Sequence, residues 1–65
     1  MTGEGDASGE VYFEFTAIGS SVKVTAMDAA TGTEVTVIGP TSAARFDLQR
    51  LALQKLRTKL KKAAT

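Results

Sequence analysis

The side chains of this sequence best suited to acid–base chemistry are carboxylates, because its 65 residues include no histidine and no cysteine. General acid and base catalysis needs two such groups placed to act on one substrate. Glu14 and Glu34 are the candidates, but residue alternation puts them on outer strands of an open sheet surface, with a middle strand between them. The serine hydroxyls have no imidazole to activate them. We therefore expect a protein that is not an enzyme and has no catalytic residues.

Two segments resemble ligand-binding loops but lack the residues that such loops need. Asp28 to Glu34 begins like a calcium loop, yet Ala30 and Gly32 occupy its third and fifth positions, where oxygen ligands are required. The run G-E-G-D-A-S-G near the start follows no strand and lacks the lysine of a phosphate-binding loop. We expect no metal site and no cofactor.

Positive charge is concentrated in the last third of the chain. Residues 1–44 hold six acidic and one basic residue, a net charge of −5, whereas residues 45–65 hold seven basic and one acidic residue, +6. A helix with this charge could contact nucleic-acid phosphates weakly and without base specificity. The candidate contacts are Arg50, Lys55, Arg57, Lys59, Lys61 and Lys62. The alternative, which we favour, is a solvated polar face whose late cations suit the helix dipole.

Strict alternation of apolar and polar residues begins at Val11 and predicts two antiparallel strands. Gly19-Ser20 between them suits a two-residue hairpin loop, with glycine at the first central position of a type II′ turn. This turn places Ala17 opposite Val22. The next cross-strand pairs on the same apolar face are then Phe15 with Val24 and Phe13 with Ala26.

A third strand is expected from Thr33 to Ile38, after a turn that includes Gly32. A four-residue loop over 29–32 would pair Val35 with Ala26 and Val37 with Val24, so that all four share the apolar face. A three-residue loop with a glycine bulge would shift this register and remains the alternative. Gly39-Pro40 is expected to end the sheet, because proline cannot donate to a strand ladder.

An amphipathic helix of roughly five turns is expected after Thr41 or Ser42, either of which suits the N-cap position. Packed on the sheet, it gives an α+β fold of order βββα. The predicted core is Val11, Phe13, Phe15, Val22, Val24, Ala26, Val35 and Val37 against Phe46, Leu53, Leu56 and Leu60. Leu51 lies outside the apolar stripe. We expect residues 1–8 to be a disordered tail and 9–65 a single domain with no membrane-spanning segment and no export signal.

The opposite face of this sheet would be uncovered in a monomer. Its large apolar side chains, the candidate protein interface, are Tyr12, Ile18, Met27 and Ile38. Association of two copies through this face, or through an edge strand, would remove the exposure. The alternative is a half-solvated threonine-rich sheet with scattered apolar residues. We therefore expect a small interaction or self-assembly module, a homodimer in our preferred interpretation, with an unidentified protein as the other possible partner.

Several runs of the sequence resemble one family of short, uncharacterised alphaproteobacterial proteins that share a domain of unknown function. These runs are E-V-Y-F-E-F from Glu10, V-K-V-T-A-M-D-A-A-T-G-T-E-V from Val22, G-P at Gly39 and R-L-A-L-Q-K-L from Arg50. The resemblance implies a bacterial, cytoplasmic setting. It implies no ligand, catalytic residue or partner.

Overall fold

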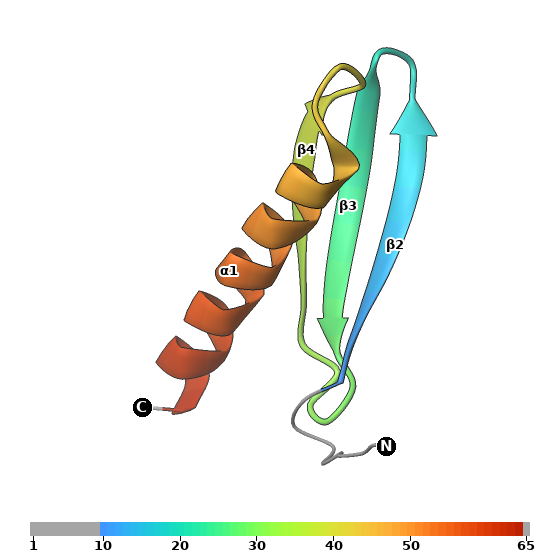
Figure 1. The fold of residues 1–65 in the computed structure, drawn as a ribbon. Helices are drawn as coiled ribbons and strands as arrows, with labels where there is room; N and C mark the ends of the chain where they lie inside the picture. The colour runs from blue at the N-terminus through green and yellow to red at the C-terminus, as the bar shows by residue number, and fades with distance from the viewer. Residues whose placement is uncertain (1–9, 65) are drawn as a thin grey trace.

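Three antiparallel strands and one helix make up the fold in a computed structural model, which describes residues 10–64. The strands are β2 (Val11–Ile18), β3 (Ser21–Asp28) and β4 (Glu34–Pro40), arranged in that order in one sheet. The helix α1 (Arg45–Ala64) crosses one face of the sheet (Figure 1). The predicted α+β fold of order βββα is confirmed. The tail predicted for residues 1–8 lies outside the described residues.

The first hairpin has the predicted turn and register. Gly19 has a φ of +59°, and no other residue of this turn has a positive φ, as a type II′ turn requires. Ile18 lies opposite Ser21, and the three apolar pairs follow as expected: Ala17 with Val22, Phe15 with Val24 and Phe13 with Ala26.

The second hairpin has the predicted four-residue loop, so the bulged alternative is excluded. Asp28 closes the loop, because its N–H donates to the Thr33 carbonyl and its own carbonyl accepts from the Gly32 N–H, both at 2.8 Å. The buried Asp28 carboxylate also accepts from the Thr31 N–H at 3.0 Å and the Thr31 hydroxyl at 2.8 Å. Val35 consequently lies opposite Ala26, and Val37 opposite Val24.

The sheet ends at Pro40, as expected, but Gly39 and Pro40 belong to the third strand, which was predicted to stop at Ile38. The third strand begins at Glu34 and continues through Pro40, with Gly39 opposite Val22 and Pro40 opposite Ser21. The backbone groups of alternate residues point to opposite sides of a strand. The Asp28 to Thr33 bond makes odd-numbered residues of β4 face β3, so the nitrogen of Pro40 faces the outer edge. Proline is tolerated there because no ladder bond is lost.

The helix begins later than predicted, at Arg45, and neither Thr41 nor Ser42 is its N-cap. Ala44 takes that position, since its carbonyl accepts from the amides of residues 47 and 48. The residues before it form a turn: the Thr41 N–H donates to the Ser20 carbonyl at 2.9 Å, and the Ala43 N–H donates to the Pro40 carbonyl at 3.0 Å. These bonds hold the connection against the first hairpin while the chain moves from the sheet to the helix layer.

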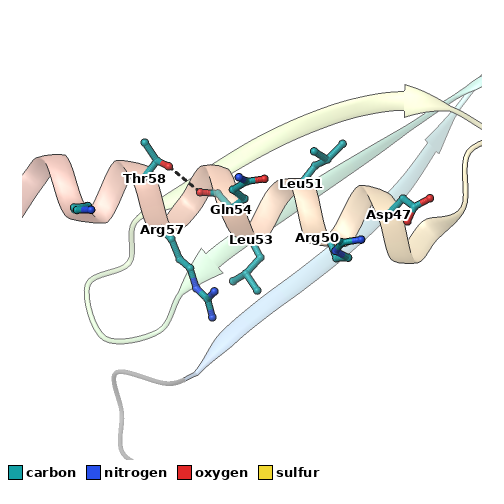
Figure 2. Close-up of a pocket in the computed structure, with 8 residues that line it drawn as sticks. Asp47, Arg50, Leu51, Leu53, Gln54, Arg57 and Thr58 are labelled. Atoms are coloured by element: carbon teal, nitrogen blue, oxygen red, sulfur yellow. Dashed lines mark hydrogen bonds between the residues drawn. The ribbon is translucent and has the colours of Figure 1, made fainter.

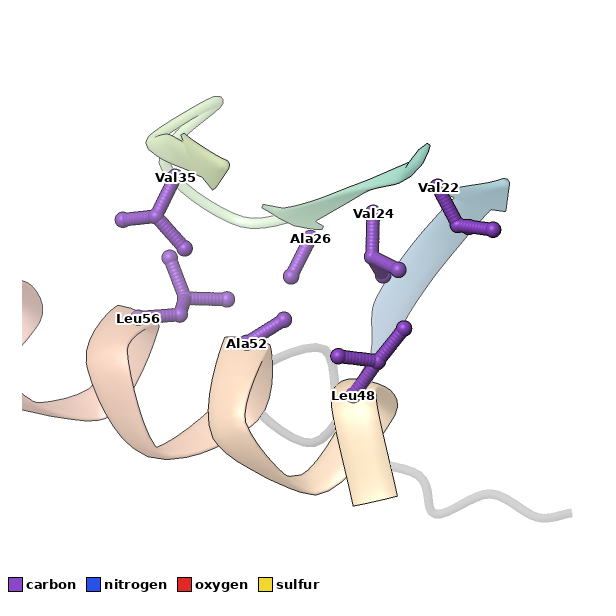
Figure 3. Close-up of a cluster of buried hydrophobic side chains, with 7 residues drawn as sticks. All are labelled: Val22, Val24, Ala26, Val35, Leu48, Ala52 and Leu56. Atoms are coloured by element: carbon purple, nitrogen blue, oxygen red, sulfur yellow. The ribbon is translucent and has the colours of Figure 1, made fainter. Parts of the chain in front are cut away.

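The core is a thin layer between the middle of the sheet and one stripe of α1. Side chains of the two layers point toward one another (Figure 3), and the buried set is Val22, Val24, Ala26, Val35, Leu48, Ala52 and Leu56. The helix lies close to the sheet where Ala52 of α1 and Ala26 of β3 are completely buried. Gly39 allows a similar approach near the helix start, because a Cβ there would lie 2.5 Å from Leu48 Cδ2.

Part of the predicted core is wrong, and the position of the helix explains why. α1 packs over β3 and β4, away from the inner face of β2. Its buried stripe is therefore centred on Ala52, whereas Phe46 is 66% exposed and Leu53 is half-buried. Leu51 is exposed, as its place outside the stripe predicts. The remaining predicted core residues are half-buried around the central cluster: Val11, Phe13, Phe15, Val37 and Leu60.

Candidate protein-interaction site

The predicted interface residues lie on the outer face of the sheet, but they do not form one patch. Tyr12, Ile18 and Ile38 are exposed and Met27 is half-buried. Tyr12 lies opposite Met27 at one end of the sheet. Ile18 and Ile38 lie on different edge strands at the other end, each beside a different residue of β3. The structure therefore brings together only the first pair.

Polar residues occupy the middle of this outer face. The hydroxyls of Thr25 and Thr36 lie 3.3 Å apart on neighbouring strands. Glu14 lies opposite Thr25 on β2, and Glu34 lies opposite Met27 on β4, so the two carboxylates are on outer strands with β3 between them, as predicted. A polar centre with apolar ends is a poor surface for continuous apolar packing of one sheet face on another.

The Tyr12 hydroxyl has a local partner at the free edge of the outer face. It donates a hydrogen bond of 3.0 Å to the Glu10 carboxylate. This bond raises the pKa of Tyr12 above its usual value, and the negative charge of Glu10 adds to the effect. The ring itself remains 52% exposed. Tyr12 is thus held over the edge strand with its aromatic face available for contact.

The two edges of the sheet are protected to different degrees, and β4 is the protected one. Odd-numbered residues of β4 bond to β3, so the carbonyls of the even-numbered residues Glu34 and Thr36 point away from β3. Lys55 Nζ donates to the Thr36 carbonyl at 3.0 Å, and Lys59 Nζ donates to the Glu34 carbonyl at 3.2 Å. Helical lysines therefore occupy acceptors that another strand would need.

The edge of β2 has no equivalent cover within residues 10–64. Ile18 and Ser21 close a two-residue hairpin and form a hydrogen-bonded pair, so even-numbered residues of β2 face β3. The N–H and C=O groups that point outward belong to Val11, Phe13, Phe15 and Ala17. No strand lies beyond β2 in the described sheet. An edge of this kind is a template for pairing with another strand.

The inner face of β2 is only partly covered by the helix. A shallow groove of about 290 Å³ separates them and is lined by Val11, Phe13, Asp28, Leu53, Leu56, Arg57 and Leu60. Near the hairpin end, the guanidinium of Arg45 lies 5.3 Å from the centre of the Phe15 ring. Within the described part of the chain, β2 is therefore exposed on its edge, along its outer side chains and over part of its inner face.

The structure divides the six predicted nucleic-acid contacts between different sides of α1. Lys55 and Lys59 lie on the β4 side, where they bind strand carbonyls. Arg50, Arg57 and Lys61, together with Asp47, line a wide, open pocket with a volume of about 720 Å³. Figure 2 shows the side chains of Asp47, Arg50 and Arg57 extending outward from the helix, with Leu53 on the β2 side. The Thr58 hydroxyl donates to the Gln54 carbonyl at 3.1 Å. Lys62 is also exposed.

Sequence reasoning missed two features of the site. The role of Lys55 and Lys59 at the β4 edge was not expected, although their four-residue spacing beside the buried stripe is the signal that could have indicated it. The exposure of Phe46 was also missed. The Arg50 guanidinium lies 5.9 Å from the centre of that ring, an exposed cation–π contact.

Of three comparisons with known proteins, one gave a match. Within residues 10–64, no helix combines the length and the apolar content needed to cross a bilayer. Searches of curated proteins and of solved structures gave no match. A family model described as Domain of unknown function (DUF6898) matches residues 8–63, which include all three strands and nearly all of α1. The chain therefore belongs to the DUF6898 family.

Proposed function

We propose that this domain is a small non-enzymatic interaction module that associates with a second copy of itself. The observation that carries the proposal is the unequal protection of the sheet: lysines cover the edge of β4, whereas no element of residues 10–64 covers the edge of β2. Tyr12 and Ile18 on β2 are each more than half exposed. The proposed setting is the bacterial cytoplasm, which rests on the sequence resemblance described above.

The proposal is supported by what a partner at β2 would cover. A thin helix-on-sheet layer gains stability from added apolar burial, because small domains bury a limited share of their surface. A partner beside β2 would pair its free backbone groups and shield its exposed side chains together. The outer face offers no comparable gain, since polar residues occupy its centre.

Sedimentation equilibrium tests the proposal directly. We expect the mass to rise from that of one chain to that of two as the protein concentration increases from low to high micromolar. Matched variants assign the contact to β2: Ile18→Asp should keep the mass near one chain, whereas Ile38→Asp, at an exposed position on β4, should leave association unchanged. A mass of one chain throughout the concentration range would refute self-association.

Weak nucleic-acid binding is the second candidate function. Arg50, Arg57 and Lys61 favour it because they share one exposed surface of α1. Binding would use phosphate contacts, so its affinity should fall steeply as salt rises. Fluorescence anisotropy with duplex and single-stranded DNA at low salt tests it, with Arg57→Glu as the disrupting variant and Lys23→Glu on the sheet as the control. An unchanged anisotropy at high micromolar protein would exclude this function.

A further inference from the structure

We propose that two copies pair through β2 in antiparallel orientation, centred on Phe15, to form one continuous six-stranded sheet. This inference rests on the proposed self-association and specifies its surface and register. A symmetric pair uses the same edge on both copies. Of the two edges, β4 has its outward carbonyls bound by Lys55 and Lys59 and has a proline nitrogen at Pro40. β2 has neither feature, so the pairing edge is β2.

The backbone of β2 permits only certain registers. The outward N–H and C=O groups belong to odd-numbered residues, so hydrogen-bonded pairs between copies must join odd residues to odd residues. Four symmetric registers pair at least five residues of the strand on each copy. They place the twofold axis at residue 13, 14, 15 or 16.

Charge argues against the register centred on residue 14. It would place Glu14 of one copy directly opposite Glu14 of the other, at a position where the Cα atoms are about 4.5 Å apart. Like charges directly opposite one another destabilise a strand pair. The two carboxylates would also lie on the outer face, where no cation of β2 is available to separate them.

Strand length separates the other three registers. The pairs that lie within β2 run only from Val11 to Phe15 when centred on residue 13, and only from Glu14 to Ile18 when centred on residue 16. Centred on residue 15, they run from Tyr12 to Ile18 and use nearly the whole strand. More of the free edge is therefore paired in the register centred on residue 15, with the Phe15 backbones of the two copies exchanging hydrogen bonds at the axis.

The side chains of β2 are self-complementary in the register centred on Phe15. On the outer face, Tyr12 of one copy lies opposite Ile18 of the other, so two of the exposed apolar residues cover each other. Glu14 lies opposite Thr16, which is neutral. On the inner face the two phenylalanine rings meet, and Phe13 lies opposite Ala17. No pair of β2 residues places like charges together.

Disulfide cross-linking tests this register, because the chain has no cysteine of its own. Positions 14 and 16 would form a non-hydrogen-bonded pair between copies, at a Cα separation of about 4.5 Å that suits a disulfide. We expect a mixture of Glu14→Cys and Thr16→Cys proteins to cross-link, on mild oxidation, at least tenfold faster than either protein alone. Both positions are exposed on the outer face, so neither substitution disturbs the core.

The alternatives give distinct cross-linking patterns. Rapid linking of Glu14→Cys to itself would indicate the register centred on residue 14, and rapid linking of Tyr12→Cys to Glu14→Cys the one centred on residue 13. Rapid linking of Thr16→Cys to itself would indicate the register centred on residue 16. Rapid linking of Ile38→Cys to itself would indicate the β4 edge. Each of these results overturns the inference. A dimer in sedimentation without the expected 14-to-16 link would refute the proposed register but not self-association. A monomer at all concentrations would refute both.

Discussion

Lys55 Nζ donates a 3.0 Å hydrogen bond to the backbone carbonyl of Thr36. The acceptor is on the side of β4 that faces away from the sheet, so the helix that covers the inner face also closes one edge. Lys59 repeats the arrangement one turn later, at Glu34. Lysines are a common means of preventing strand addition at a sheet edge. In the proposed dimer they would limit association to the other edge, which would close the assembly at two copies.

Removal of both edge lysines should convert closed association into open-ended association. In Lys55→Met/Lys59→Met, the carbonyls of β4 become available while β2 remains free, so copies can join through different edges without closure. We expect species larger than a dimer in sedimentation velocity at high concentration. Arg50→Met/Lys61→Met removes the same charge from the outer helix surface and is the control. Identical mass distributions for the two double variants would contradict the edge-protecting role.

Proline at position 17 should block pairing without breaking the monomer's own sheet. The Ala17 N–H points to the free edge, so its loss leaves the β2–β3 ladder intact. In the proposed dimer it removes two symmetric hydrogen bonds, each worth about 0.5–1.5 kcal/mol, which corresponds to a roughly 5- to 150-fold weaker dimer. Analytical ultracentrifugation measures the change. Ile38→Pro makes the same alteration at the β4 edge and should leave dimerisation intact; equal weakening by both would argue against β2.

Gly39 should be the glycine least tolerant of a methyl group in the interior of the fold. An alanine Cβ there would lie 2.5 Å from Cδ2 of the buried Leu48. Overpacking of this kind typically costs about 1–3 kcal/mol. The contacting atoms are at the end of the Leu48 side chain, which can shift, so we expect urea unfolding of Gly39→Ala to show a loss near the lower end of that range. The same substitution in a Leu48→Ala background should cost much less, because the contacting atoms are gone. An undiminished loss in that background would mean that another contact is responsible.

The strand register could be predicted from the sequence because short-range features determine it. A glycine at the first turn position fixes the pairing of Ala17 with Val22, and the position of Gly32 suits the four-residue second loop. The place of Pro40 in the third strand could not be predicted in the same way. It depends on which edge its nitrogen faces, and that follows only once the register is known.

The sideways position of the helix could not be predicted from its apolar stripe. The stripe is broad, since Phe46 and Ala52 lie about 120° apart around the helix, and its width does not determine which part faces the sheet. Two alanines, Ala26 and Ala52, permit the closest approach and so centre the helix over β3 and β4. The unequal edges of the sheet follow from that placement. The sequence therefore predicts exposed side chains on β2 but not that β2 is the open edge.

The stability of two helix variants should show where α1 is centred. Leu56 is completely buried, so Leu56→Ala should cost about 2–5 kcal/mol of unfolding free energy. Phe46 is 66% exposed, and Phe46→Ala should cost less than about 1 kcal/mol, including the loss of its contact with Arg50. Both values come from urea titrations monitored by circular dichroism. A larger loss for Phe46→Ala than for Leu56→Ala would mean that the helix is rotated toward β2.

Salt should affect the two candidate functions in opposite directions. Each Arg45 guanidinium lies on a Phe15 ring, so pairing centred on Phe15 brings two guanidinium groups toward the same axis. Added salt screens their repulsion, and we expect the dimer to become slightly stronger between low and physiological ionic strength. Arg45→Gln should remove this dependence in sedimentation equilibrium. Phosphate binding by Arg50, Arg57 and Lys61 would instead weaken steeply over the same range, because released counterions favour association at low salt. Self-association that weakens with salt would contradict an axis beside Phe15.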